Sequence, residues 1–210
     1  MRSTNATPVV LVNGASGAIG AEIARQFARS GAHVVVNCAD SDRAAEVADA
    51  IRAAGGLATP LAADTYEELD TAALIASIGA RFGRLDAAIL TASEAPGRSA
   101  RALRRFAELA LPLMPAGGYF AFVTNHQAHF YPNKAVPMGY TTVAATMRAG
   151  ETALYAMRPQ FAGAGVRFSV VTGDMYGDTT AVATAVVMAA TTVNPAGVVC
   201  VGSADYLMTA

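Results

Sequence analysis

The sequence predicts an α/β fold in which a doubly wound, seven-stranded parallel sheet carries helices on both faces. Two observations predict it. Short apolar runs alternate with longer segments of helical period along the whole chain, and a glycine-rich turn directly follows the first apolar run. Because crossovers between parallel strands are right-handed, the helices are expected to cover both faces of the sheet.

Each element is read from its own stretch of sequence. The strands are short runs rich in Val, Ile and aromatic residues, and the helices fill the gaps, several of them ending at a glycine. Strands are expected at 8–13, 33–37, 58–62, 87–91, 119–124, 167–172 and 198–202. Helices are expected at 18–30, 41–54, 66–82, 98–114, 140–161 and 179–192. No linker or repeat interrupts them, so residues 1–210 are expected to form one domain.

Composition excludes several classes of protein. The 210 residues are 53% hydrophobic and 15% charged, which excludes a disordered chain. The formal net charge is −1, so a basic surface for nucleic acid is not expected. The apolar runs are shorter than the ~20 residues that a bilayer requires, and the amino terminus lacks an export signal. Cys38 and Cys200 are too few for a disulfide framework. We therefore expect a cytoplasmic protein whose partner is a small molecule.

The first expected strand runs directly into Asn13-Gly14-Ala15-Ser16-Gly17-Ala18-Ile19-Gly20, and a helical pattern follows. Glycines at this place permit a tight turn and let the backbone approach a pyrophosphate, whose negative charge is favoured at a helix amino terminus. A strand-to-helix turn with a purely structural role is the alternative. The residues expected to contact a dinucleotide here are Gly14, Ser16, Gly17, Ile19 and Gly20.

Together with segments elsewhere in the chain, this turn resembles the short-chain dehydrogenase/reductase family. The segments are RFGRLD at 81–86, LPLM at 111–114 with Gly117-Gly118, and Gly165-Val166-Arg167, each of which precedes an expected strand. The resemblance implies a Rossmann-like fold and an oxidoreductase that uses NAD or NADP. It also implies that Asp64, with Thr65 beside it, lies near the adenine, and that Ala92 lies near the cofactor.

The end of the second expected strand bears on the choice of dinucleotide. Family members that prefer NAD tend to carry an acidic residue there, which holds the ribose 2′-hydroxyl. Here the position is Asn37-Cys38, and Ser41 and Arg43 follow as groups that could receive a 2′-phosphate. NADP is therefore expected, with NAD as the alternative. A solvated charge in the first turn of a helix is the other interpretation of Arg43.

The sequence departs from the family at the residues of its chemistry. The resemblance implies a tyrosine that donates a proton and, in a YxxxK motif, a lysine that lowers the pKa of that tyrosine. Counting from Tyr140 puts Ala144 in the place of the lysine. Counting back from Gly165 instead puts Val143 and Met147 in the places of the tyrosine and the lysine. The motif is absent in both registers, because Lys134 is the only lysine of the chain.

Other side chains are candidates for the missing chemistry. The family's serine position falls on Asn125 and its helical asparagine near Ser99. His126 and Tyr140 are expected to do acid/base work, with Asn125 as a donor to a substrate oxygen. A loop histidine without a role is the alternative for His126. A metal site with His129 is not expected, because a third ligand at a suitable spacing is missing.

Three functions remain open on this sequence. The first is an NADP-dependent reductase or dehydrogenase that acts on a carbonyl/alcohol pair with a non-standard active site. The second is non-redox chemistry on the same fold, such as dehydration, isomerisation or cyclisation. The third is a non-catalytic dinucleotide-binding protein. The resemblance also implies a homodimer or homotetramer, formed through the helices expected at 98–114 and 140–161.

Overall fold

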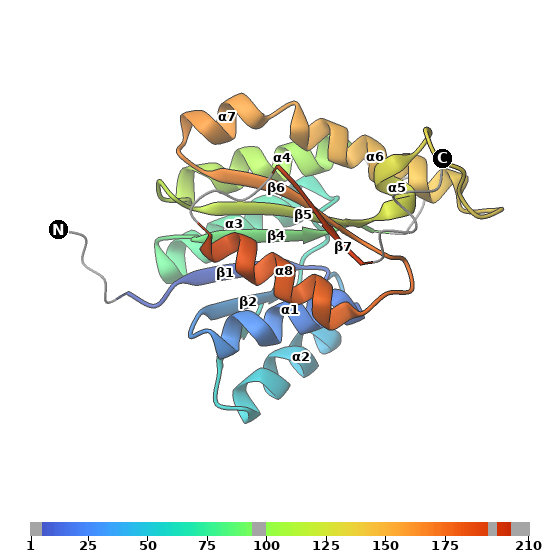
Figure 1. Cartoon of the computed structure of the whole chain (residues 1–210). Coiled ribbons are helices and arrows are strands. Elements are labelled where there is room, and N and C mark those ends of the chain that lie inside the picture. Colours follow the sequence, from blue (N-terminus) through green and yellow to red (C-terminus); the bar gives the residue numbers. More distant parts are fainter. Residues whose placement is uncertain (1–5, 94–99, 193–196, 203–210) are drawn as a thin grey trace.

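The computed structural model describes residues 6–93, 100–192 and 197–202, and it shows one sheet between two layers of helices (Figure 1). All neighbouring strands are parallel, in the order β3-β2-β1-β4-β5-β6-β7. The expected fold class is confirmed. The strands are β1 (Val9–Asn13), β2 (His33–Asn37), β3 (Leu57–Pro60), β4 (Ala87–Thr91), β5 (Tyr119–Asn125), β6 (Arg167–Gly173) and β7 (Val198–Val201).

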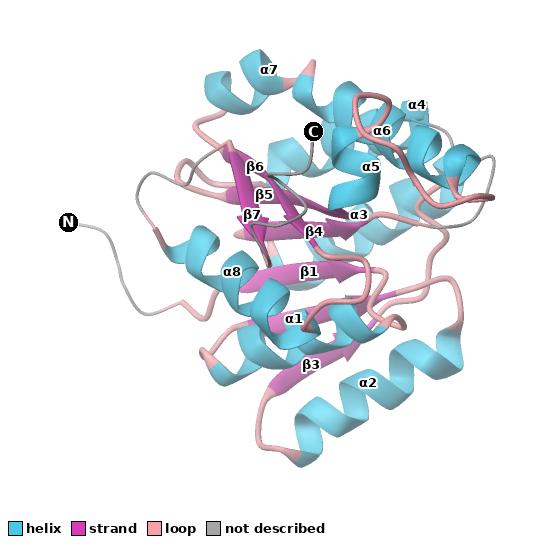
Figure 2. Cartoon of the chain, turned by 45° about the vertical axis from the view of Figure 1, so that its right-hand side comes forward, coloured by secondary structure: helices cyan, strands magenta, loops and turns pink. Residues whose placement is uncertain are grey.

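Two groups of helices cover the two faces of this sheet (Figure 2). One face is covered by α1 (Ala18–Arg29), α2 (Ser41–Ala53) and α8 (Thr179–Thr191). The other face is covered by α3 (Glu68–Phe82), α4 (Ala100–Ala110), α6 (Thr141–Tyr155) and α7 (Arg158–Gly163). The short helix α5 (His126–Phe130) follows β5 directly. Among the described helices, none has the length and hydropathy that crossing a membrane requires.

The residues of β1 show why the strands are apolar at every position. Val10 and Val12 pack into the cluster beneath α1, α2 and α8, while Val9 and Leu11 pack into the cluster on the opposite face. All four side chains are buried. A parallel strand with helices on both sides has no solvent-exposed face. Its sequence is therefore a continuous apolar run instead of an alternating one.

The strand order places a crevice at the carboxyl end of β1. The chain passes from β1 to β2 and β3 in one direction and then returns to β4 on the other side of β1. In open parallel sheets, ligands bind beyond the carboxyl ends of the strands at the point where the order reverses. The glycine-rich turn follows β1, and Ala92 follows β4, so both lie at this point.

Two helix predictions were wrong in detail. The helix expected at 140–161 is divided into α6 and α7, because Pro159 lies in the first turn of α7 and cannot continue a preceding helix. The residues after β5 were expected to form a loop, but they form α5, which Asn125 caps. The helix expected at 98–114 is described from Ala100, so Ser99, the expected position of the family's asparagine, lies outside the described residues.

Candidate functional site

A cavity of about 360 Å³, here called the cleft, opens at the carboxyl ends of β1, β4, β5 and β6. One side of the cleft is formed by the glycine-rich turn and the start of α8, and the other by the ends of β5 and β6 with one residue of α6. The lining residues are Gly14, Gly17, Ala18, Ile19, Gly20, Thr91, Ala92, Val123, Thr124, Asn125, Met147, Gly173, Asp174, Met175, Thr179 and Val182.

Two glycines of the turn are required by the fold itself. Gly14 has a φ of +78°, and a Cβ built on it would lie 1.9 Å from the hydroxyl oxygen of Thr91. A Cβ on Gly20 would lie 2.3 Å from the carbonyl oxygen of Gly14. The backbone amides of Gly14 and Ala15 both donate to the carbonyl oxygen of Asn37, at 3.0 Å each. These contacts close the turn against β2 and β4 and leave no room for a side chain.

Gly17 differs from the other two glycines. It has an ordinary φ of −82°, and a Cβ there would lie 3.5 Å from the oxygen of Gly14, which is normal van der Waals contact. Gly17 is exposed and stands at the amino terminus of α1, where no side chain caps the first helical amides. Packing therefore does not demand a glycine here, whereas close approach of an anion to the helix amino terminus would. Ser16 beside it is exposed, and Ile19 lines the cleft.

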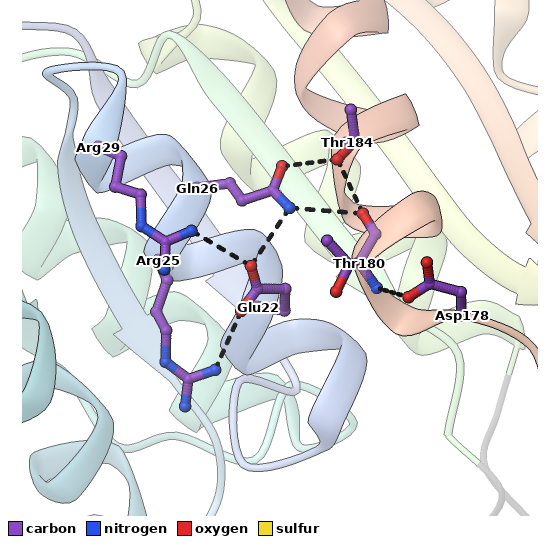
Figure 3. Close-up of polar contacts among 7 residues, drawn as sticks. All are labelled: Glu22, Arg25, Gln26, Arg29, Asp178, Thr180 and Thr184. Atoms are coloured by element: carbon purple, nitrogen blue, oxygen red, sulfur yellow. Dashed lines mark hydrogen bonds and ion pairs between the residues drawn. The ribbon is translucent and has the colours of Figure 1, made fainter.

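Polar side chains connect the start of α8 to α1, the helix that follows the glycine-rich turn (Figure 3). The side-chain amide of Gln26 in α1 donates to the carbonyl oxygen of Thr180 at 3.4 Å and to Glu22 at 3.2 Å, and it accepts from the Thr184 hydroxyl at 3.2 Å. Asp178 caps α8 by accepting from the Thr180 amide at 2.8 Å. These contacts fix the first turn of α8, whose residue Thr179 lines the cleft.

The residues expected to receive a 2′-phosphate, Ser41 and Arg43, lie at the start of α2. Asn37, at the end of β2, is fully buried, and its side chain donates to the carbonyl oxygens of Leu61 at 2.7 Å and Ala63 at 3.2 Å. Ser41 and Arg43 are both exposed.

The carboxylate of Asp40 accepts from the backbone amides of Asp42 at 3.0 Å and Arg43 at 3.2 Å and so caps the helix. This carboxylate lies close to the expected 2′-phosphate residues and was not among the sequence-predicted site residues. A capping Asp is an ordinary signal of a helix start and could have been found.

The two residues expected near the adenine lie after β3, outside the lining of the cleft. Thr65 is buried, and its hydroxyl accepts from the side-chain amide of Asn13 at 3.0 Å, which ties this segment to the end of β1. Asp64 is partly exposed, and its carboxylate accepts from the amide of Tyr66 at 3.0 Å. Ala92, the third residue implied by the resemblance, does line the cleft and donates to the carbonyl oxygen of Val123 at 2.8 Å.

Asn125 and Tyr140 come together although they belong to different elements. Asn125 ends β5, and its side-chain oxygen accepts from the amide of Ala128 at 2.9 Å as the cap of α5. Its side-chain nitrogen donates to the hydroxyl of Tyr140 at 2.6 Å. The sulfur of Met147 lies 3.6 Å from that hydroxyl and 3.9 Å from the Asn125 nitrogen. A phenol and an amide donor thus meet beside a thioether next to the cleft.

The structure also distinguishes the two possible lysine positions. Ala144 is fully buried and packs with Ala128 of α5, so it does not face the cleft. Met147, one turn later, does line the cleft. The site therefore combines the tyrosine of one sequence register, Tyr140, with the lysine position of the other. The charged group implied by the resemblance is replaced at that position by an uncharged sulfur.

His126 is part of the protein interior and does not line the cleft. Its Nε2 lies 3.0 Å from the carbonyl oxygen of Val201, which can only accept, so Nε2 carries the hydrogen. Its Nδ1 then accepts from the hydroxyl of Thr172 at 3.0 Å. Burial lowers the pKa of His126, and the carboxylate of Asp174, with an oxygen 3.6 Å from Nε2, opposes this shift. The acid/base role expected for His126 does not fit this geometry, because both ring nitrogens hold β6 and β7 in place.

The second histidine of α5 pairs with a residue that the sequence did not single out. Nδ1 of His129 lies 2.9 Å and 3.0 Å from the two carboxylate oxygens of Glu151 in α6. The described part of the chain contains no group of three His, Cys, Asp or Glu residues that could hold a metal ion. Glu151 carried no signal in the sequence, because one acidic residue in a helix is usually solvated.

Comparisons with known proteins agree with this architecture. A family model described as short chain dehydrogenase matches residues 8–108. An A-factor type gamma-butyrolactone 1'-reductase (1S-forming) of Streptomyces virginiae is 38% identical over 91 residues, which are 43% of this chain and 35% of that protein. The matched segment thus spans about a third of the length of that curated relative.

Solved structures extend the likeness of the fold over nearly the whole chain. A promiscuous reductase that catalyses keto-reduction at C1 during lugdunomycin biosynthesis superposes with a TM-score of 0.80 at 23% identity, covering 95% of this chain and 97% of that chain. A short chain dehydrogenase from Burkholderia cenocepacia in complex with NADP gives a TM-score of 0.79 at 20% identity, covering 92% of this chain and 96% of that chain. Residues 8–108, the segment that holds the glycine-rich turn and the reversal point of the sheet, thus belong to the short-chain dehydrogenase/reductase family.

Proposed function

We propose that this chain is a reductase that converts a carbonyl group of a small molecule to an alcohol, with a nicotinamide dinucleotide as the source of hydride. The observation that carries the proposal is the pair of Asn125 and Tyr140, whose amide nitrogen and hydroxyl oxygen lie 2.6 Å apart. Asn125 lines the same cleft as the glycine-rich turn. A proton donor thus stands beside the surface on which a dinucleotide would bind.

The turn fits the pyrophosphate of a dinucleotide. Gly17 leaves the amino terminus of α1 bare and without a side-chain cap, and unpaired helical amides bind anions. A bound dinucleotide would supply the hydride. The residues that would hold it are the cleft residues Gly14, Gly17, Ile19, Gly20 and Ala92, with Ser16 beside the turn and Asp64 and Thr65 toward the adenine.

The chain's own residues supply the proton. The hydroxyl of Tyr140 would give its proton to the carbonyl oxygen as the carbonyl carbon takes up hydride, which would yield the alcohol. The phenolate left on Tyr140 would then recover its proton from solvent. The amide of Asn125 orients the phenol and is itself a donor toward a substrate oxygen. Met147 contacts both groups without adding charge. His126 does not line the cleft. Its hydrogen bonds to Thr172 and Val201 hold β6, which ends at the cleft, together with β7.

We infer that NADP is the preferred dinucleotide, with NAD as the alternative. The exposed side chains of Ser41 and Arg43 support this choice, since a guanidinium pairs well with a 2′-phosphate. The carboxylate of Asp40 opposes it by charge but is engaged as a helix cap. Arg43→Ala tests the assignment: the Kd for NADPH is expected to rise about 10-fold, because one charge-assisted contact is lost, while the Kd for NADH stays unchanged.

A second candidate function is non-redox chemistry on the same fold, and the observation that favours it is Met147 at the lysine position. Without a cation at that place, Tyr140 and Asn125 could still polarise a carbonyl for dehydration or isomerisation. Consumption of the dinucleotide distinguishes the two functions. A third function, dinucleotide binding without catalysis, predicts no product of either kind.

The test begins with binding. Purified protein is titrated with NADPH and NADH by fluorescence, and a panel of aldehydes, ketones and quinones is then offered with the tighter binder. Loss of the near-ultraviolet absorbance of the reduced dinucleotide with formation of an alcohol supports the reductase. Conversion of a substrate at constant absorbance supports the second candidate, and failure to bind either dinucleotide contradicts the proposal.

We also propose that the chain forms a homodimer or homotetramer through α4 and α6. These helices pack against each other, and a hollow of about 720 Å³ lies on the surface between α3, α4 and α6. It is lined by side chains of both charges, Arg101, Arg104 and Arg105 with Glu67, Glu68 and Glu108, and by Ala153 of α6. A face with both charges can pair with its own copy about a two-fold axis.

A further inference from the structure

A carboxylate with no exposure to solvent lies between α5 and α6. The side chain of Glu151 is fully buried. Its two oxygens lie 2.9 Å and 3.0 Å from Nδ1 of His129, and the guanidinium of Arg148 also donates to it. His129 is mostly buried, whereas Arg148 is partly exposed.

Stability alone does not account for this arrangement. Transfer of a carboxylate from water to a protein interior is costly, and its partners return that cost only when the geometry is good. Buried ion pairs can often be replaced by packed apolar side chains with no loss of stability. The elements that the contact between Glu151 and His129 joins therefore indicate its role.

The contact joins the two elements that carry the proposed proton donor and its partner. α5 is only five residues long, with Asn125 capping its start and His129 near its end. α6 begins after Tyr140 and carries both Met147 and Glu151. The pair of His129 and Glu151 is a polar link between the far end of α5 and α6, and Ala128 and Ala144 pack between the helices.

We propose that Glu151 is a positioning residue for the proton transfer: by holding His129 it fixes α5 against α6, so that the Asn125 amide stays within hydrogen-bond distance of the Tyr140 hydroxyl. This inference rests on the proposed function. Displacement of a positioned group by about 1 Å can lower turnover by about 100-fold without loss of binding. Glu151 therefore acts on turnover, through Asn125 and Tyr140, and not on dinucleotide affinity.

Two variants separate positioning from stability. Glu151→Gln keeps an oxygen that can accept from His129, and it is expected to keep turnover within about 3-fold of the wild type. The double variant with Glu151→Leu and His129→Leu removes the buried charge together with its more buried partner, and the partly exposed Arg148 can turn to solvent, so Tm is expected to change little. Its kcat is expected to fall by about 10-fold or more, with the Kd for NADPH unchanged.

Ser169→Ala is the matched control. The Ser169 hydroxyl donates to the hydroxyl of Tyr119 at 3.0 Å, and both side chains are buried outside the cleft. Loss of this hydrogen bond is expected to lower Tm without a change in kcat. If kcat in the double variant equals that of the wild type, or falls no further than in a control of equal Tm, the inference is overturned.

A second measurement needs no activity. In nuclear magnetic resonance spectra, the side-chain amide of Asn125, assigned with Asn125→Asp, is expected to exchange slowly in the wild type and quickly in the double variant, with an intermediate effect of Tyr140→Phe. Equal protection in the wild type and the double variant overturns the inference. If the wild type reduces no carbonyl, or Tyr140→Phe keeps full turnover, the proposed function fails instead, and the amide exchange decides the positioning role alone.

Discussion

The side-chain amide of Asn125 donates to the hydroxyl of Tyr140 across 2.6 Å, although 15 positions separate the two residues in the chain. The contact brings the end of β5 to the start of α6, with α5 folded between them. A substrate oxygen in the cleft could therefore meet an amide donor and a phenol together, which is the arrangement that carbonyl reduction requires.

The first prediction concerns the glycine-rich turn. In Gly17→Val, the Kd for NADPH is expected to rise by about 10-fold or more, because the side chain would cover the bare amino terminus of α1. Tm is expected to change little, because a Cβ there meets only an ordinary contact at 3.5 Å. Gly20→Ala is the control that lowers Tm, since its Cβ would lie 2.3 Å from a carbonyl oxygen. If Gly17→Val binds NADPH as tightly as the wild type, the turn is only architectural.

The second prediction compares the two lysine positions. Ala144→Lys is expected to lower the free energy of unfolding by about 3 kcal/mol or more, because it forces an ammonium group between α5 and α6. Met147→Lys is expected to fold, since residue 147 lines the cleft. It is not expected to raise kcat, because the new cation would stand beside the side-chain amide of Asn125, which already donates to the Tyr140 hydroxyl. Urea unfolding and steady-state kinetics check both variants. A kcat more than about 10-fold above the wild type would mean that the site merely lacks a lysine.

The third prediction follows from the buried His126. Its folded-state pKa is lowered by burial from the usual value of 6.5, so the unfolded chain takes up a proton first as the pH falls. The stability that depends on neutral His126 is thus fully present above pH 6.5 and is lost as the pH falls below it.

Urea unfolding from about pH 7.5 to about pH 5 should show a smaller loss of stability in His126→Phe than in the wild type. His33→Gln is the control, because burial also lowers the pKa of His33, and it should remove a separate part of the slope. Parallel curves for the wild type and His126→Phe would contradict the prediction.

The fourth prediction concerns assembly. Light scattering at micromolar concentration is expected to give two or four times the chain mass of 21.4 kDa. Ala153→Arg places a long charged side chain in the hollow between α3, α4 and α6 and is expected to give the single-chain mass. Ala50→Arg, on the exposed surface of α2, should leave the mass as in the wild type. A single-chain mass for the wild type would remove the proposed interface.

The sequence was sufficient for the sheet because burial on two faces leaves a direct trace in the residues. The runs that form β1, β4 and β5 are apolar at nearly every position. The glycines of the turn are required by close contacts of Gly14 with Thr91 at the end of β4 and of Gly20 with Gly14. Local spacing therefore predicted the strands and the turn.

The roles of polar side chains could not be predicted in the same way, because their partners lie far along the chain. His126 bonds to Val201, which is 75 residues away, and nothing in the residues around His126 indicates that contact. The pairing of Glu151 with His129 likewise depends on α5, a helix too short to show a period in sequence. The sequence alone could not decide between Ala144 and Met147 as the lysine position. The decision required the position of α5, which covers the side of α6 that carries Ala144.

The most direct test of the central claim is the turnover of Tyr140→Phe beside its dinucleotide affinity. The substitution removes one hydroxyl, which accepts from Asn125, and leaves the ring that packs near α5. With the carbonyl substrate found in the panel, kcat is expected to fall by about 100-fold or more, with the Kd for NADPH unchanged, because the proton donor alone is lost. A kcat equal to that of the wild type would contradict the account, since the proton would then come from a group other than Tyr140.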